Sequence, residues 1–135
     1  MRPVTMRRRG AIALALVAPF GMGAAPASSG SPLDPVQQLV AGLLAIMKAG
    51  PSTPFAQRAQ QFGPVVDRTF DLDAVLRASV GPSWASLSPA EQNGLLQAFR
   101  RYTINSYVNS FNSYDGQRLL VNPETRSVGA EEIVR

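Results

Sequence analysis

After residue 30, apolar residues recur at intervals of three and four positions, which is the spacing of amphipathic helices. The first such run predicts a helix over residues 35–49. Asp34 before Pro35 is a typical helix start, with Asp34 as the N-cap, and Gly50-Pro51 ends the run. The chain therefore begins its folded part with an amphipathic helix.

A second apolar run extends over residues 55–70, after the start signal Thr53-Pro54. Proline has no N–H to donate to the helix ladder, so Gly63-Pro64 predicts that this helix is kinked or divided. Asp71 is then expected to cap a short third helix, which Gly81-Pro82 ends.

The fourth and longest run begins at Ser88-Pro89-Ala90-Glu91, a capping box with proline at the first helical position. It is expected to continue to Asp115-Gly116. At about 100° per residue, one broad face collects Leu96, Phe99, Thr103, Ile104, Tyr107, Val108, Ser110, Phe111 and Tyr114. The pattern favours an amphipathic helix with a ringed apolar side, and it leaves open whether the rings pack in a core or line a cavity.

The pattern changes to short strands after this helix. Residues 117–121 predict one strand, residues 122–125 a turn, and residues 131–135 the start of a second strand. A lone hairpin is marginal in water. This ending therefore predicts a fragment or a truncated product that lacks part of its sheet, and residues 28–135 by themselves are expected to be prone to aggregation.

The N-terminal segment has the features of a secretory signal peptide. Four arginines within residues 2–9 precede an apolar stretch over residues 10–24, and Ala25-Pro26-Ala27 is a small-x-small cleavage site. The stretch is too short to favour the alternative, a transmembrane anchor. We expect residues 1–27 to be the signal peptide and residues 28–135 to be the exported domain.

The net charge of +4 also belongs to this segment. Four of the 13 basic side chains and none of the nine acidic ones lie in residues 1–27, so the rest of the chain carries nine of each. A surface that follows nucleic-acid phosphates needs an excess of Lys and Arg. Nucleic acid is therefore not an expected partner.

Composition also argues against catalysis, because the chain has no His and no Cys, the commonest zinc ligands and general bases. No cofactor or metal is expected. Asp71 and Asp73 resemble a carboxylate pair, yet a helix cap and a first-turn acid explain them better. Arg100, on the apolar side of its helix, either pairs with one of Asp67, Asp71 and Asp73 or meets an anionic ligand; the internal pair is favoured.

The order of these features resembles the MlaC-like family of periplasmic lipid carriers, also called the toluene-tolerance or ABC-transporter auxiliary family. Within it, the chain is most similar to the hopanoid-associated HpnM branch. The resemblance covers about residues 55–121. It is carried by Pro64-Val65-Val66, Phe70-Asp71-Leu72, Gly81 to Trp84, Leu87 to Gln92, Phe99 to Tyr114, and Gly116.

The resemblance implies an α+β fold in which helices pack on one face of a curved, mainly antiparallel sheet, with a lipid cavity between the two layers. It further implies a periplasmic carrier for phospholipid or hopanoid. The partners would be an inner-membrane ABC transporter with an MCE-domain protein and an outer-membrane lipid-transfer component. No covalent chemistry is implied.

The residues expected to line the cavity come from the apolar positions of three helices and the segment between them. Core packing is the alternative for each one. They are Val65, Val66, Phe70, Leu76, Val80, Trp84, Leu96, Phe99, Tyr107 and Phe111. Trp84 is expected at the rim of the pocket. An exported scaffold module without cargo is the second functional hypothesis, and an exported enzyme is the third.

Overall fold

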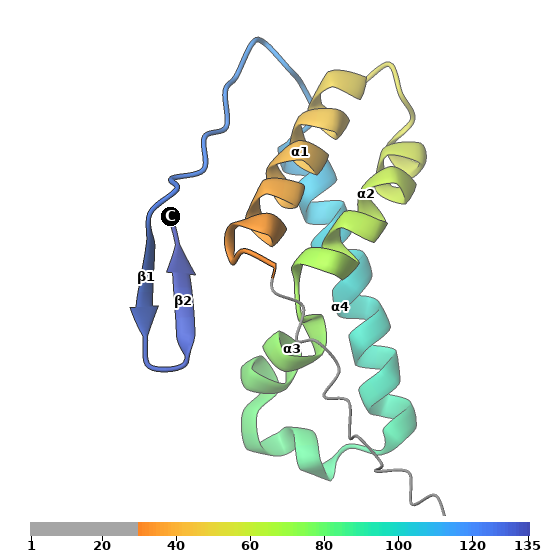
Figure 1. Ribbon diagram of the computed structural model, residues 1–135. Coiled ribbons are helices and arrows are strands. Elements are labelled where there is room, and N and C mark those ends of the chain that lie inside the picture. Colours follow the sequence, from red (N-terminus) through yellow and green to blue (C-terminus); the bar gives the residue numbers. More distant parts are fainter. Residues whose placement is uncertain (1–29) are drawn as a thin grey trace, which may run out of the picture.

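The computed structural model describes residues 30–135, which form an α+β structure, as expected. The predicted signal peptide, residues 1–27, lies outside this range. The helices and strands, in chain order, are α1 (Leu33–Ala49), α2 (Phe55–Thr69), α3 (Leu72–Val80), the 3₁₀ helix η1 (Gly81–Ser86), α4 (Pro89–Ser110), β1 (Thr125–Val128) and β2 (Glu131–Val134). Figure 1 shows α1, α2 and α4 packed together, with the hairpin beside the N-terminal half of α1.

Two of the predicted helix starts are confirmed. Asp71 accepts a hydrogen bond from the N–H of Ala74 at 3.0 Å and so caps α3. At the start of α4, the Ser88 hydroxyl accepts the N–H of Glu91, whose carboxylate accepts the N–H of Ser88 at 2.8 Å. These caps satisfy backbone donors that would otherwise lack partners at the helix ends.

The other two predicted starts are wrong in detail. Helix α1 begins at Leu33, so Asp34 lies in its first turn and accepts the N–H of Ser31 at 3.0 Å. Thr53 precedes α2 but donates its hydroxyl to the carbonyl of Ala49, at the end of α1. In both places a proline follows the polar residue, and the polar side chain bonds to the preceding turn of the chain.

The sequence predicted a kink or a division at Pro64; helix α2 is continuous there, so the division does not occur. Phe62 and Val66 flank the proline and are completely buried in the helical core. Pro64 itself is exposed. Burial of two large apolar side chains contributes several kcal/mol, which outweighs the hydrogen bond that Pro64 cannot make.

The C-terminal part of the chain differs most from expectation. Helix α4 ends at Ser110, and residues 117–121 form no strand. Leu119 in this segment packs against the helical core, so its apolar pattern reflects packing on helices. The sheet is an antiparallel hairpin, with Thr125 opposite Val134 and a tight turn at Gly129, whose φ is +63°. The second predicted strand is confirmed.

The core is formed by two residues from each of the three long helices: Leu43, Ile46, Phe62, Val66, Ile104 and Val108. Arg58 is the one buried charged residue in the described range, and it donates hydrogen bonds to the carbonyls of Val108 and Thr53 at 3.3 and 3.2 Å. Helices α1 and α2 approach closely at Gly42. A Cβ there would lie 2.8 Å from Cγ1 of Val65.

Candidate functional site

Three partly exposed aromatic side chains stack in a row on one flank of the helices. Tyr107 lies in the middle, with ring centroids 5.9 Å from Phe70 and 6.1 Å from Phe111 and interplanar angles of 30° and 26°. Behind the row, the buried Phe62 packs against Tyr107 at 5.5 Å and 55°. These distances lie in the range of favourable aromatic pairs. The row is therefore a rigid apolar surface anchored in the core.

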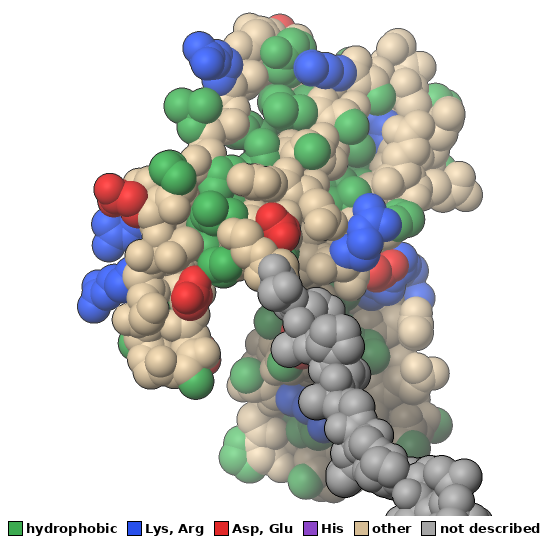
Figure 2. Space-filling view, viewed as in Figure 1, with side chains coloured by type: hydrophobic (Ala, Val, Ile, Leu, Met, Phe, Trp, Pro, Cys, Tyr) green, Lys and Arg blue, Asp and Glu red, His purple; other side chains and the backbone are tan. Residues whose placement is uncertain are grey.

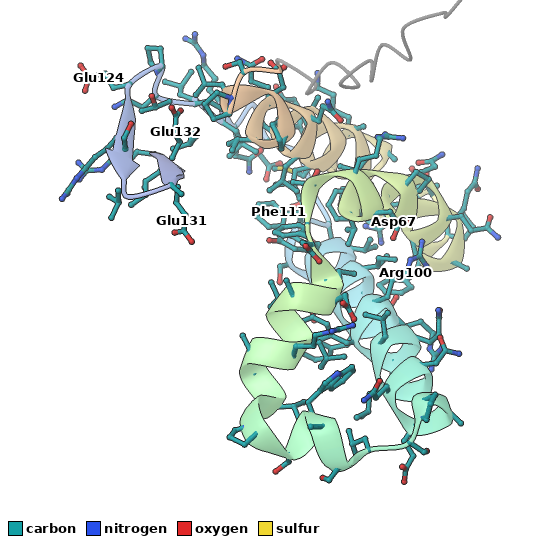
Figure 3. The ribbon with its side chains drawn as sticks, turned by 60° about the horizontal axis from the view of Figure 1, so that its bottom comes forward. Asp67, Arg100, Phe111, Glu124, Glu131 and Glu132 are labelled. Carbon is teal, nitrogen blue, oxygen red and sulfur yellow. The ribbon has the colours of Figure 1, made fainter. Side chains whose placement is uncertain are left out.

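The three aromatic residues of the row lie at the C-terminal ends of α2 and α4. Phe70 directly follows the last residue of α2, and Tyr107 and Phe111 stand one turn apart at the end of α4. Phe111 lies on the flank nearer to the hairpin, whereas Asp67 and Arg100 lie on the other flank (Figure 3). On the face seen in Figure 2, apolar side chains gather where the hairpin approaches the helices.

A hollow of about 270 Å³ adjoins Phe70 where α2, α3 and α4 meet. Its apolar lining is Phe70, Leu72 and Leu96, so the structure brings together two residues that were predicted from separate helices. Its polar lining is Asp67, Asp71, Asp73, Gln97 and Arg100. The hollow adjoins the aromatic row at Phe70 and reaches the charged side chains of Asp67 and Arg100 on the other flank (Figure 3).

The other predicted cavity residues divide into buried and partly exposed ones. Val66 is completely buried, and Leu76 is buried with 7% of its surface exposed. The partly exposed ones are Val65 in α2, Val80 in α3, Trp84 in η1, and Leu96 and Phe99 in α4. Helix α3 packs on α4. The guanidinium of Arg77 lies 5.7 Å from the centre of the Trp84 ring.

Arg100 and Asp67 form a two-pronged ion pair. Nε of Arg100 lies 2.6 Å from Oδ1 of Asp67, and Nη2 lies 2.7 Å from Oδ2. This hydrogen bonding holds the pKa of Asp67 below its usual range and raises the pKa of Arg100. The preferred interpretation of Arg100, an internal carboxylate partner, is confirmed.

The carboxylates of Asp71 and Asp73 have separate structural roles, as expected. Asp71 caps α3, and Asp73 pairs with Arg77 one turn further along the same helix at 2.8 Å. Among residues 30–135, no group of three or more potential ligand side chains is placed to hold a metal ion.

Another hollow was not predicted from the sequence. It is a groove of about 570 Å³ between α2 and α4, lined by Phe55, Ala56, Ala59, Gln60, Gly63, Pro64, Arg100, Arg101, Ile104 and Asn105. The available signal was a row of small residues in α2, at positions 56, 59 and 63, one and two turns apart. None of the ten predicted cavity residues lines this groove.

The model of the MlaC protein family matches residues 37–135, from the first helix to the last strand. The chain belongs to the MlaC family. MlaC proteins are periplasmic lipid-binding transport components that work with the Mla ABC transport system, and they are not an enzyme family. No curated protein and no solved structure matches the chain. Within residues 30–135, none of the helices has the length and hydrophobicity needed to cross a bilayer.

Proposed function

We propose that this MlaC protein is a soluble carrier that shuttles a phospholipid or a hopanoid between the inner and outer membranes. Residues 1–27 would direct its export to the periplasm. An ABC transporter with an MCE-domain protein would be its partner at the inner membrane, and a lipid-transfer component would be its partner at the outer membrane. The protein would bind its cargo without covalent chemistry.

The row of Phe70, Tyr107 and Phe111 is the observation that carries this proposal. Each ring is packed on one side against the core and keeps part of its surface accessible. Each methylene of a lipid tail that such a wall removes from water contributes about 0.8 kcal/mol. The affinity would therefore come from the apolar body of the lipid, and a polar headgroup would remain in water.

The proposed wall has a centre and an extension. The three stacked rings would form the centre, Leu96 would adjoin it through the hollow that it shares with Phe70, and Val65 would also belong to the wall. Val80, Trp84 and Phe99 would extend it along α3, η1 and α4. Val66 and Leu76 are buried and would support the wall from behind.

The test is mass spectrometry of the lipid extracted from the purified full-length protein. A carrier should co-purify with lipid, whereas a scaffold module should not.

Phe111→Asp places a charge on the wall and should remove the lipid. Tyr102→Asp, in α4 about two and a half turns before Phe111 and 69% exposed, is the matched control and should retain it. Circular dichroism would establish that both variants are folded. Equal lipid occupancy in the two variants would reject the wall, and absence of lipid from the wild type would favour the scaffold.

A further inference from the structure

The groove between α2 and α4 lies on the flank of the helices that carries Arg100 and Asp67, away from Phe111 (Figure 3). Its lining on α2 runs from Phe55 to Pro64. At 1.5 Å per residue this is about 14 Å, the length of about four residues of extended chain. The groove therefore has the dimensions of a short peptide segment.

The hollow exists because α2 presents small side chains to α4. Ala56, Ala59 and Gly63 line it on the α2 side. A Cβ on Gly63 would lie 3.1 Å from Nη2 of Arg100 and 3.6 Å from Cδ1 of Ile104. The glycine thus leaves room for the arginine side chain, which lies against α2 at that point.

The groove offers hydrogen-bonding groups of both kinds along an apolar floor. Pro64 has no N–H, so the carbonyl of Gln60 lacks the donor that a regular helix would supply. Asn105, whose side-chain amide can donate and accept hydrogen bonds, lines the α4 side. A peptide can satisfy both groups, because its backbone carries an N–H and a carbonyl at each residue. An acyl chain can satisfy neither.

The two arginines that line the groove among the described residues differ in their ion pairing. The charge of Arg100 is paired with Asp67. Arg101 lines the groove, is exposed, and forms no ion pair with any of residues 30–135. Within residues 30–135, no acidic residue lines the groove. This charge distribution is complementary to a single carboxylate.

We propose that this groove is the docking site for a segment of the Mla transporter, in which an apolar side chain fits the floor and a neighbouring carboxylate pairs with Arg101. The proposal rests on the function proposed above. A membrane surface is the less suitable occupant, because binding to anionic lipid typically uses clusters of about four to eight basic residues. Of the described residues, Arg101 alone brings an unpaired positive charge to the groove.

The test measures binding of the full-length protein to the Mla transporter complex of the same organism, reconstituted in nanodiscs. Arg101→Glu reverses the free charge, and Ala56→Trp fills the groove. Arg118→Glu and Ala98→Trp are matched controls at exposed positions outside it. We expect both groove variants to bind at least tenfold more weakly than the wild type and both controls to bind normally. Lipid occupancy and the melting temperature should stay unchanged in all four.

Equal affinity of groove and control variants would overturn the docking proposal, as would a lack of wild-type binding. Vesicles of phosphatidylglycerol form a second arm of the experiment. Loss of vesicle binding in the groove variants, with transporter binding retained, would assign the groove to lipid and overturn the proposal. Lipid occupancy is measured separately. It tests the carrier function, whereas transporter binding tests the docking site, so failure of one proposal can be told from failure of the other.

Discussion

On one flank of the α2–α4 pair, three aromatic rings stack over the core and carry no charge. On the other flank, alanines and a glycine leave a groove edged by two arginines and two amide side chains. The same two helices build both surfaces, and side-chain size decides the difference. Large rings project and suit a fluid apolar ligand, whereas small residues leave a hollow with backbone and charged groups within reach.

The largest expected effect comes from removing the centre of the ringed flank. Tyr107→Ala deletes the ring that contacts Phe62, Phe70 and Phe111, so we expect a loss of about 2–3 kcal/mol in the free energy of unfolding. Tyr102→Ala, at an exposed position of the same helix, should change it by less than about 0.5 kcal/mol. Urea denaturation of both variants checks this, and equal losses would mean that the row is not anchored in the core.

The next largest effect concerns the contact that supports Val65. Gly42→Ala places a methyl group 2.8 Å from a stiff β-branched side chain, so α1 must move and stability should fall by about 1–3 kcal/mol. Gly94→Ala is the control, because nothing lies within 4 Å of its added Cβ. In the interior of α4 it should stabilise the protein by about 0.5–1 kcal/mol. A higher melting temperature for Gly42→Ala would contradict the close packing of α1 and α2.

The smallest effect is expected at the ion pair on the groove flank. The folded-state pKa of Asp67 is lowered, so its contribution is present above the unfolded pKa of about 4 and is lost as the pH falls through the folded value. Both side chains are more than a third exposed, so Asp67→Asn should cost less than about 1 kcal/mol at pH 7. Denaturation at pH 7 and pH 3 should show this difference shrinking in acid; an unchanged difference would exclude the ion pair as its source.

Arg100→Gln gives a related prediction about the ligand. Because the guanidinium is already bonded to Asp67, its loss should leave the amount of co-purified lipid unchanged. Mass spectrometry of extracted lipid checks this against the Phe111→Asp variant. A selective loss of anionic phospholipid in Arg100→Gln would instead support the alternative in which Arg100 contacts a headgroup.

Local sequence signals predicted the helices well where a side chain bonds to its own helix. The Asp71 cap and the box at Ser88 need only residues three positions apart. The predictions failed where distant packing decided the structure. Phe62 and Val66 keep α2 undivided at Pro64, where a division was one of the two expected outcomes, and Leu119 packs on helices where a strand was expected.

The candidate site divides in the same way. The rings of Tyr107 and Phe111 stand out in the helical pattern, and Asp67 was one of three carboxylates that Arg100 was expected to reach. The groove could not be predicted, because a hollow depends on how closely α2 and α4 approach each other. Small residues at positions 56, 59 and 63 are equally compatible with tight helix packing.

The central claim is that lipid binds the ringed flank and leaves the α2–α4 groove free. Photo-crosslinking with a phospholipid that carries a diazirine in its acyl chain tests it most directly, with the attachment sites mapped by mass spectrometry of the digested full-length protein. We expect attachment at or beside Phe70, Tyr107 or Phe111. Attachment confined to the groove, at Phe55, Ala59 or Ile104, would contradict it.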